Sequence, residues 1–136
     1  MDDWDECRIE NAAITQSIDE RKSKSLQKVS NGRIKYLEKQ KITKEDINYI
    51  FEGYYTSIVE LLHAITINKG FKVNNHICLG YYLRDVLKKE KLFRIFDDLR
   101  YKRNSLVYYG KDMEFEIAKE AIVNSKNLIE ELIDFQ

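Results

Sequence analysis

The stretch from Thr43 to Gly70, TKEDINYIFEGYYTSIVELLHAITINKG, decides the fold class of this chain. Thr43 and Asp46 have the spacing of a capping box, in which a hydroxyl at a helix start is followed three residues later by an acid. Apolar side chains then recur at intervals of three and four, which predicts one buried helical face. Gly70 follows Asn68 and Lys69, and glycine ends many helices because it adopts left-handed backbone easily. The stretch therefore predicts a long helix with defined ends.

The residues before this helix predict another long helical segment, from about 5 to 40. Its apolar positions are sparse. Serine, asparagine and glycine fall together at Ser30–Gly32, and because these residues favour non-helical backbone we expect a bend there. The first part of the segment is polar enough to be mobile or to rest on a second subunit.

The residues after Gly70 predict three further helices joined by short turns, and no strand. Asn74 or Asn75 is expected to cap the first of them. Gly110 is expected to end the second helix, and Asp112 to cap the third. Because the links are short, neighbouring helices should run antiparallel.

Composition agrees with an all-α chain of one domain. The 136 residues contain no proline and only five glycines, which is few turn residues for a β-rich fold of this size. We therefore expect an antiparallel up-and-down bundle of four to five helices over 1–136. Its core should lie in 43–136, with a long, bent or partly mobile helix in 1–40.

Charge is balanced in total but uneven along the chain. The net charge is zero, which argues against bulk electrostatic capture of nucleic acid. Arg21–Lys41 holds eight cations and one anion, whereas Asp112–Gln136 holds seven anions and two cations. Such runs are usually the solvated faces of helices, and the alternative is that they orient a partner.

The chain shows no apolar run of membrane-spanning length, and its acidic start, MDDWDE, is unlike a secretory signal. We therefore expect a cytoplasmic protein with no membrane association. Cys7 and Cys78 are expected to be free thiols in that reducing compartment, with a disulfide as the alternative. No CxxC motif and no Cys/His cluster occurs, so we expect neither a metal nor a cofactor.

A second stretch, LRYKRNSLVYYG from Leu99 to Gly110, contains the candidate site. Arg103 falls on the inward stripe of its helix, with Leu92, Phe96, Leu99 and Leu106. A guanidinium keeps its charge in a protein, so it is not buried without a carboxylate, a phosphate or water beside it. Either Arg103 pairs with an acid from another helix, such as Glu60, or it faces a cleft open to solvent.

This stretch resembles the HEPN superfamily of helical bundle proteins. Members end their penultimate core helix with an arginine, a polar residue, a short spacer and a histidine. Arg103, Asn104 and Tyr108 stand at corresponding places, with tyrosine where the family has histidine. The segments ELLHAI, NNHICLGYYL and DLRYKRNSLVYYG extend the likeness from about residue 44 to the C-terminal end.

The resemblance implies a compact bundle that forms a two-fold homodimer, with both copies of the motif in one shared cleft. Catalytic HEPN proteins are metal-independent ribonucleases. Others are toxins paired with a nucleotidyltransferase of the MNT type, and some only bind nucleotides or proteins.

The residue types of the motif suit phosphate chemistry. Imidazole exchanges protons near neutral pH, and arginine stabilises phosphoryl oxygens with a planar set of donors. A phenol is a poor base at neutral pH, so the tyrosine argues against catalysis. The candidate catalytic residues are Arg103, Asn104 and Tyr108. The candidate phosphate-binding residues are Arg100, Lys102, Arg103 and Tyr109.

Other rings lie outside the motif. His63 falls on an apolar helix face and is expected to be a core residue, and His76 is expected to be a surface or capping residue, although either can in principle reach the cleft. Tyrosine pairs on helices usually pack in a core or an interface, and base stacking is the alternative. These tyrosines are Tyr54, Tyr55, Tyr81, Tyr82, Tyr101, Tyr108 and Tyr109.

Three functions follow from these patterns. The sequence favours a HEPN-like protein that binds RNA or a nucleotide, or that serves in a toxin–antitoxin pair. The first alternative is an active metal-independent endoribonuclease that uses Tyr108 or His63. The second is a protein-interaction module in which an internal carboxylate neutralises Arg103.

Overall fold

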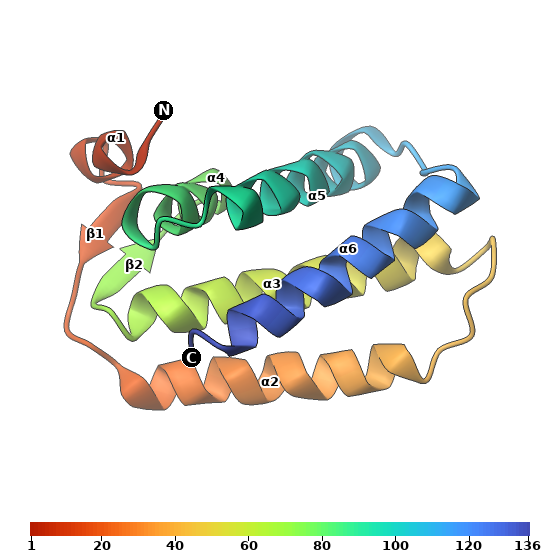
Figure 1. The fold of residues 1–136 in the computed structure, drawn as a ribbon, viewed down its shortest axis with the longest axis horizontal. Helices are drawn as coiled ribbons and strands as arrows, with labels where there is room; N and C mark the ends of the chain where they lie inside the picture. The colour runs from red at the N-terminus through yellow and green to blue at the C-terminus, as the bar shows by residue number, and fades with distance from the viewer.

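The computed structural model describes all of residues 1–136, as a helical bundle with a small two-stranded sheet (Figure 1). Its elements are, in chain order, α1 (Trp4–Ile9), β1 (Ala13–Thr15), α2 (Glu20–Glu38), α3 (Ile47–Ile67), β2 (Phe71–Val73), α4 (His76–Tyr81), a π-helical turn η1 (Tyr82–Val86), α5 (Glu90–Tyr109) and α6 (Phe115–Ile133). The prediction of a mainly helical chain is confirmed. The prediction that it has no strand is wrong, because β1 and β2 pair antiparallel with Ala13 opposite Val73.

Helix α3 is the centre of the bundle. Helix α2 packs along one side of it and α6 along another, while α4 and α5 lie above it in the view of Figure 1. The long helices α2, α3, α5 and α6 alternate in direction along the chain. The largest fully buried side chains include Phe51, Tyr54 and Tyr55 of α3. The helix with the clearest sequence pattern therefore carries much of the core.

Helix α2 runs without a break, so the expected bend at Ser30–Gly32 is wrong. The Ser23 hydroxyl donates to the Ala64 carbonyl of α3 (2.8 Å), and the Ser30 hydroxyl donates to the Ser57 carbonyl (2.9 Å). Both serines are buried. Their small side chains, anchored on α3, let the two helices approach closely, so residues with low helix propensity are held helical by tertiary contacts.

The same contact, here called the α2–α3 seam, also explains why position 53 is a glycine. It is formed by Ser23, Ser30 and Leu37 of α2 with Gly53, Ser57 and Ala64 of α3. A Cβ on Gly53 would lie 2.8 Å from Cδ2 of Leu37, so a larger residue there would have to displace the Leu37 side chain. The connection of residues 39–46 reverses the chain direction, so that α3 packs antiparallel against α2 along this seam.

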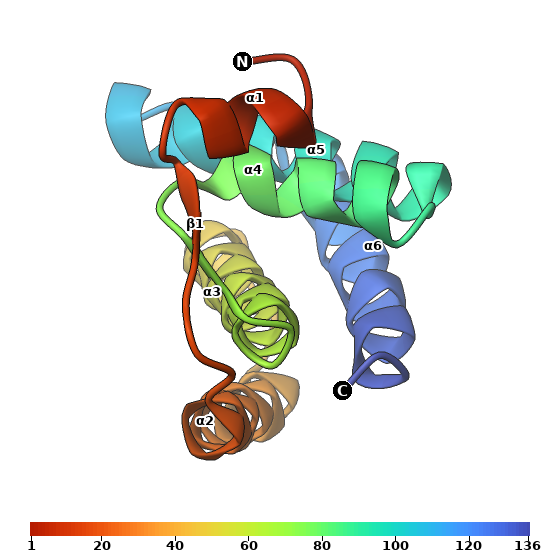
Figure 2. The same cartoon turned by 90° about the vertical axis from the view of Figure 1, so that its left-hand side faces the viewer.

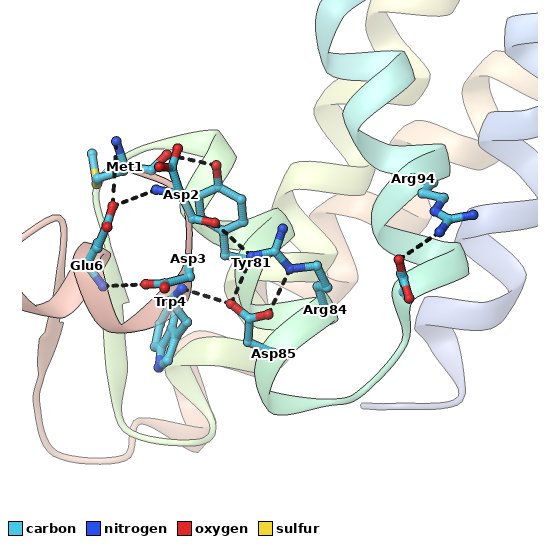
Figure 3. A network of polar contacts seen from close by, with 10 residues as sticks. Met1, Asp2, Asp3, Trp4, Glu6, Tyr81, Arg84, Asp85 and Arg94 are labelled. Carbon is cyan, nitrogen blue, oxygen red and sulfur yellow. Dashed lines mark hydrogen bonds and ion pairs between the residues drawn. The ribbon is translucent and has the colours of Figure 1, made fainter.

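The first break in the chain falls at 10–19 instead, and the residues before it pack on their own chain. Trp4 and Cys7 are buried, and the Trp4 ring meets Tyr82 edge to face at 5.1 Å. Figure 3 shows the polar contacts of this region: the Trp4 backbone N–H donates to Asp85 Oδ2 (2.9 Å), and Arg84 donates to the Asp2 carbonyl (2.8 Å). The start of the segment thus packs on its own chain, and its contact with a second subunit stays a prediction.

Cys7 and Cys78 form a disulfide, so the expectation of free thiols is also wrong. The two residues are 71 positions apart, but α1 lies against α4 and the Cα atoms are 6.1 Å apart. The bond therefore ties the N-terminal segment to the short helix that follows β2.

Most of the expected helix ends are where local chemistry predicts them. Gly70 and Gly110 have positive φ angles of 87° and 62°, which is the left-handed backbone that ends helices. The Asn75 side chain accepts the Cys78 backbone N–H at 2.9 Å and caps α4.

The other two expected caps differ from the prediction. Thr43 accepts the Asp46 backbone N–H (3.2 Å), but the Asp46 side chain makes no capping bond in return, so the box is half formed. Asp112 does not cap α6, because the helix begins only after Glu114. The turn before α6 is instead held by Asn48 of α3, whose Oδ1 accepts the Met113 N–H at 2.9 Å.

None of the helices combines the length and the apolar character that crossing a bilayer requires.

Candidate functional site

A pocket of about 370 Å³ lies between the start of α4 and the C-terminal half of α5. One wall is residues 74–77 and the other is α5. Its lining residues are Asn74, Asn75, His76, Ile77, Arg100, Arg103, Asn104 and Tyr108. No carboxylate lines it and only one histidine does, so it offers no set of metal ligands.

The Arg103 guanidinium has no carboxylate partner. Glu60, the acid considered in the sequence, pairs with Arg33 at 3.0 Å. The other half-buried arginines each pair with an acid: Arg33 with Glu60, Arg84 with Asp85 and Arg100 with Asp97. Arg103 is the exception, although it lies on the inward stripe of α5.

The contacts that Arg103 does make leave most of its donors unused. Its Nη1 lies 3.4 Å from Tyr108 Oη and 3.5 Å from Asn104 Oδ1, which is the outer limit for a hydrogen bond. Its guanidinium carbon lies 5.5 Å from the ring centroids of both Tyr55 and Tyr108, within the range of cation–π attraction. Nε and Nη2 donate to no protein atom. The group is held by aromatic faces while two of its nitrogens stay free.

Tyr55 is the anchor beneath this arrangement. It is fully buried in α3 and its ring stacks on Phe96 with centroids 5.9 Å apart. Burial raises the pKa of Tyr55 above its ordinary value. Its phenol therefore stays neutral, and its Oη lies 2.8 Å from Nδ1 of His76.

His76 lines the pocket, which the sequence did not predict. It is half-buried, whereas a surface or capping role was expected, and the cap of α4 is Asn75. Burial, followed by the Arg103 charge, lowers the pKa of His76 to about 4. The pocket therefore holds a neutral imidazole at pH 7, and an anion bound beside it would raise that pKa.

The remaining predicted residues divide between the pocket and its surroundings. Asn104 and Tyr108 line it, and so does Arg100, although Arg100 is already paired with Asp97 at 2.8 Å. Lys102 lies outside the pocket and pairs with Asp98. Tyr109 also lies outside it and is 75% exposed.

His63 reaches neither the core nor this pocket. It is half-buried in a separate hollow beside Lys22 and Lys72. Burial, and then the Lys22 charge, lower its pKa. Of the tyrosines, Tyr54, Tyr55, Tyr81 and Tyr82 are buried, while Tyr101, Tyr108 and Tyr109 are exposed.

The sequence indicates the position of His76 along its helix but not its place in the pocket. The Asn75 cap predicts where α4 starts, and so places His76 in its first turn. Nothing in the local pattern says that this turn faces α5, because that depends on how α4 packs over α3.

No family model, no curated protein and no solved structure matches the chain. The pocket presents an unpaired guanidinium, asparagine amides and a tyrosine hydroxyl as donors, a neutral imidazole and no carboxylate.

Proposed function

We propose that this chain binds the phosphate of RNA or of a nucleotide in the pocket between α4 and α5. The observation that carries the proposal is Arg103, the one half-buried arginine without a carboxylate. Its free Nε and Nη2 are the pair of nitrogens that binds two phosphate oxygens side by side. A phosphate there would supply the negative charge that the surrounding protein lacks.

The other lining groups suit the same ligand. The Asn75 and Asn104 amides and the Tyr108 hydroxyl can donate to phosphate or ribose oxygens. Because no acid lines the pocket, nothing in it repels an anion. The interaction-module alternative requires that an internal carboxylate neutralises Arg103. Arg103 forms no ion pair, and Glu60, the acid expected for this role, pairs with Arg33.

The resemblance to HEPN proteins supports the same class of ligand. With it we propose a homodimer, and a nucleotidyltransferase of the MNT type as the partner in a toxin–antitoxin pair. The cytoplasm stays a prediction, and the Cys7–Cys78 disulfide weighs against it because such bonds are rare in a reducing cytosol. Alkylation of free thiols in intact cells would test that location.

Binding of a labelled RNA oligonucleotide and of a nucleotide, each measured over a salt series, tests the main proposal. We expect Arg103→Ala to weaken both by about tenfold or more, the loss of one charge-assisted phosphate contact. Arg94→Ala is the matched control, since Arg94 lies on the same helix, is exposed and pairs with Glu90. Equal losses in the two variants, or unchanged binding in Arg103→Ala, would contradict the proposal.

A second candidate function is metal-independent RNA cleavage, and the position of His76 favours it. His76 places an imidazole in the same pocket as Arg103. An imidazole is the group that the motif lacks, because position 108 is a tyrosine. Cleavage in EDTA that disappears in Arg103→Ala and in His76→Ala would support this function. Cleavage that survives both substitutions would come from a contaminant.

A further inference from the structure

A second basic hollow lies beside the candidate pocket. It measures about 260 Å³ and is formed by Lys22 and Leu26 of α2, His63 and Ile67 of α3, and Lys72 and Val73 of β2. No acid is among these residues. Both lysines are exposed and take part in no ion pair, and the half-buried His63 ring has no hydrogen-bond partner. Three nitrogen-bearing side chains from three elements thus face one space without a counter-charge.

One short segment of chain joins the two hollows. Residues 72 and 73 line the second hollow, and residues 74–77 line the pocket of Arg103. The charge of His63 also contributes, after burial and Arg103, to lowering the pKa of His76. In Figure 2 the green connection from β2 into α4 lies on the side of the molecule away from α6, above α3 and α2.

The spacing suits a polymer of nucleotides. Four residue steps separate Lys72 from His76, and at about 3.3 Å per step they span at most about 13 Å. Stacked nucleotides rise ~3.4 Å each along one strand, so about four of them or fewer cover this span.

We propose that the two hollows are successive phosphate subsites for one single-stranded RNA, which crosses residues 72–77 between Arg103 and the Lys22–His63–Lys72 hollow. The inference rests on the proposed function and narrows its ligand from any nucleotide to a polynucleotide. Lysines that follow a backbone in this way add affinity without reading sequence. The strand is single because the two hollows are small, about 260 and 370 Å³, and a flexible backbone enters such hollows where a stiff duplex does not.

The test compares uridine 5′-monophosphate with oligouridylates of two, four, six and eight nucleotides. We expect affinity to rise steeply between two and six nucleotides. In Lys22→Ala/Lys72→Ala the six-nucleotide RNA should bind about tenfold more weakly, and the slope of log K against log salt should fall by about 1.4, or ~0.7 for each lost contact. Binding of the monophosphate should change by less than about twofold, because its phosphate lies at Arg103.

Lys119→Ala/Lys126→Ala is the control, because it removes the same net charge from exposed positions on α6. It should leave binding of the six-nucleotide RNA within about twofold of the unsubstituted chain. Arg103→Ala should weaken both ligands. Circular dichroism of all variants shows whether each is folded.

The outcomes separate the two proposals. If Lys22→Ala/Lys72→Ala binds the six-nucleotide RNA as tightly as the unsubstituted chain, or if affinity does not depend on length, the second subsite is wrong while monophosphate binding at Arg103 stands. A duplex that binds more tightly than the single strand also overturns it. If neither monophosphate nor RNA binds, the proposed function itself fails.

Discussion

The α2–α3 seam and the C-terminal half of α5 both place polar side chains on the inward face of a helix, but they use them differently. In the seam, Ser23 and Ser30 are buried and each hydroxyl donates to a carbonyl of α3. In α5, Arg103 stays half-buried with two nitrogens unbonded and no carboxylate beside it.

The difference shows how a structural polar group is told from a functional one. A serine hydroxyl needs one or two hydrogen bonds, which a neighbouring helix can supply at close range. A guanidinium carries a charge and five donors, and leaving them unmatched costs stability unless a ligand or water completes them. The seam is not fully satisfied either, because the buried Ser57 hydroxyl has no hydrogen-bond partner. What distinguishes Arg103 is that its unmatched group carries a charge and lines a pocket open to solvent.

The largest effect should come from the bond that ties one wall of the site to the N-terminal segment. Because the disulfide spans 71 positions, Cys7→Ser/Cys78→Ser should lower the free energy of unfolding by ~4 kcal/mol. Hydrogen exchange should show that amides of α1 and α4 lose protection first while the α2–α3 seam keeps it. If amides of the seam lose protection to the same extent, the disulfide does not stabilise the α1–α4 region selectively.

The next effect compares one polar-to-apolar change in each region. Ser30→Leu forces extra volume into the seam and should destabilise the chain by about 1–3 kcal/mol in urea unfolding. Arg103→Leu removes a charge with open bonds, so stability should change by less than ~0.5 kcal/mol or increase.

The reverse result, a tolerant Ser30 and a destabilising Arg103→Leu, would reject the comparison. If Arg103→Leu stabilises the chain and leaves RNA and nucleotide binding unchanged, the interaction-module alternative is favoured over the proposed function.

The smallest effect is a pH dependence that arises at the site. The folded pKa of His76 is about 4, below its ordinary value, so the unfolded chain binds more protons between about pH 6.5 and 4. The contribution of His76 is therefore fully present above about pH 6.5 and is lost as the pH falls toward 4. Urea unfolding at several pH values should show a shallower dependence in His76→Asn.

His63 provides the control for that measurement. Its pKa is lowered too, so some pH dependence should remain in His76→Asn and decrease further in the variant that also carries His63→Asn. A His76→Asn chain with the full pH dependence of the unsubstituted protein would show that His76 is not the titrating group.

Much of the helical architecture could be predicted because it depends on near neighbours. The ends at Gly70 and Gly110, and the cap at Asn75, follow from the conformational preferences of single residues. The anomalous place of Arg103 on an apolar stripe was visible from spacing alone.

The errors involve residues whose state is set by distant partners. Ser30–Gly32 stays helical because α3 accepts the Ser30 hydroxyl, and β1 forms because β2 lies beside it. His76 enters the site because α4 packs over α3 and next to α5.

The sequence by itself determined the helices that follow Thr43, the stops at Gly70 and Gly110 and the one arginine out of place, because periodicity and capping act between residues a few positions apart. Only the tertiary structure decided which polar groups are satisfied. The disulfide joins residues 71 positions apart and the Ser30–Ser57 bond joins residues 27 apart, and no local pattern records such contacts. The same packing brought His76 to Arg103 and left that guanidinium without an acid.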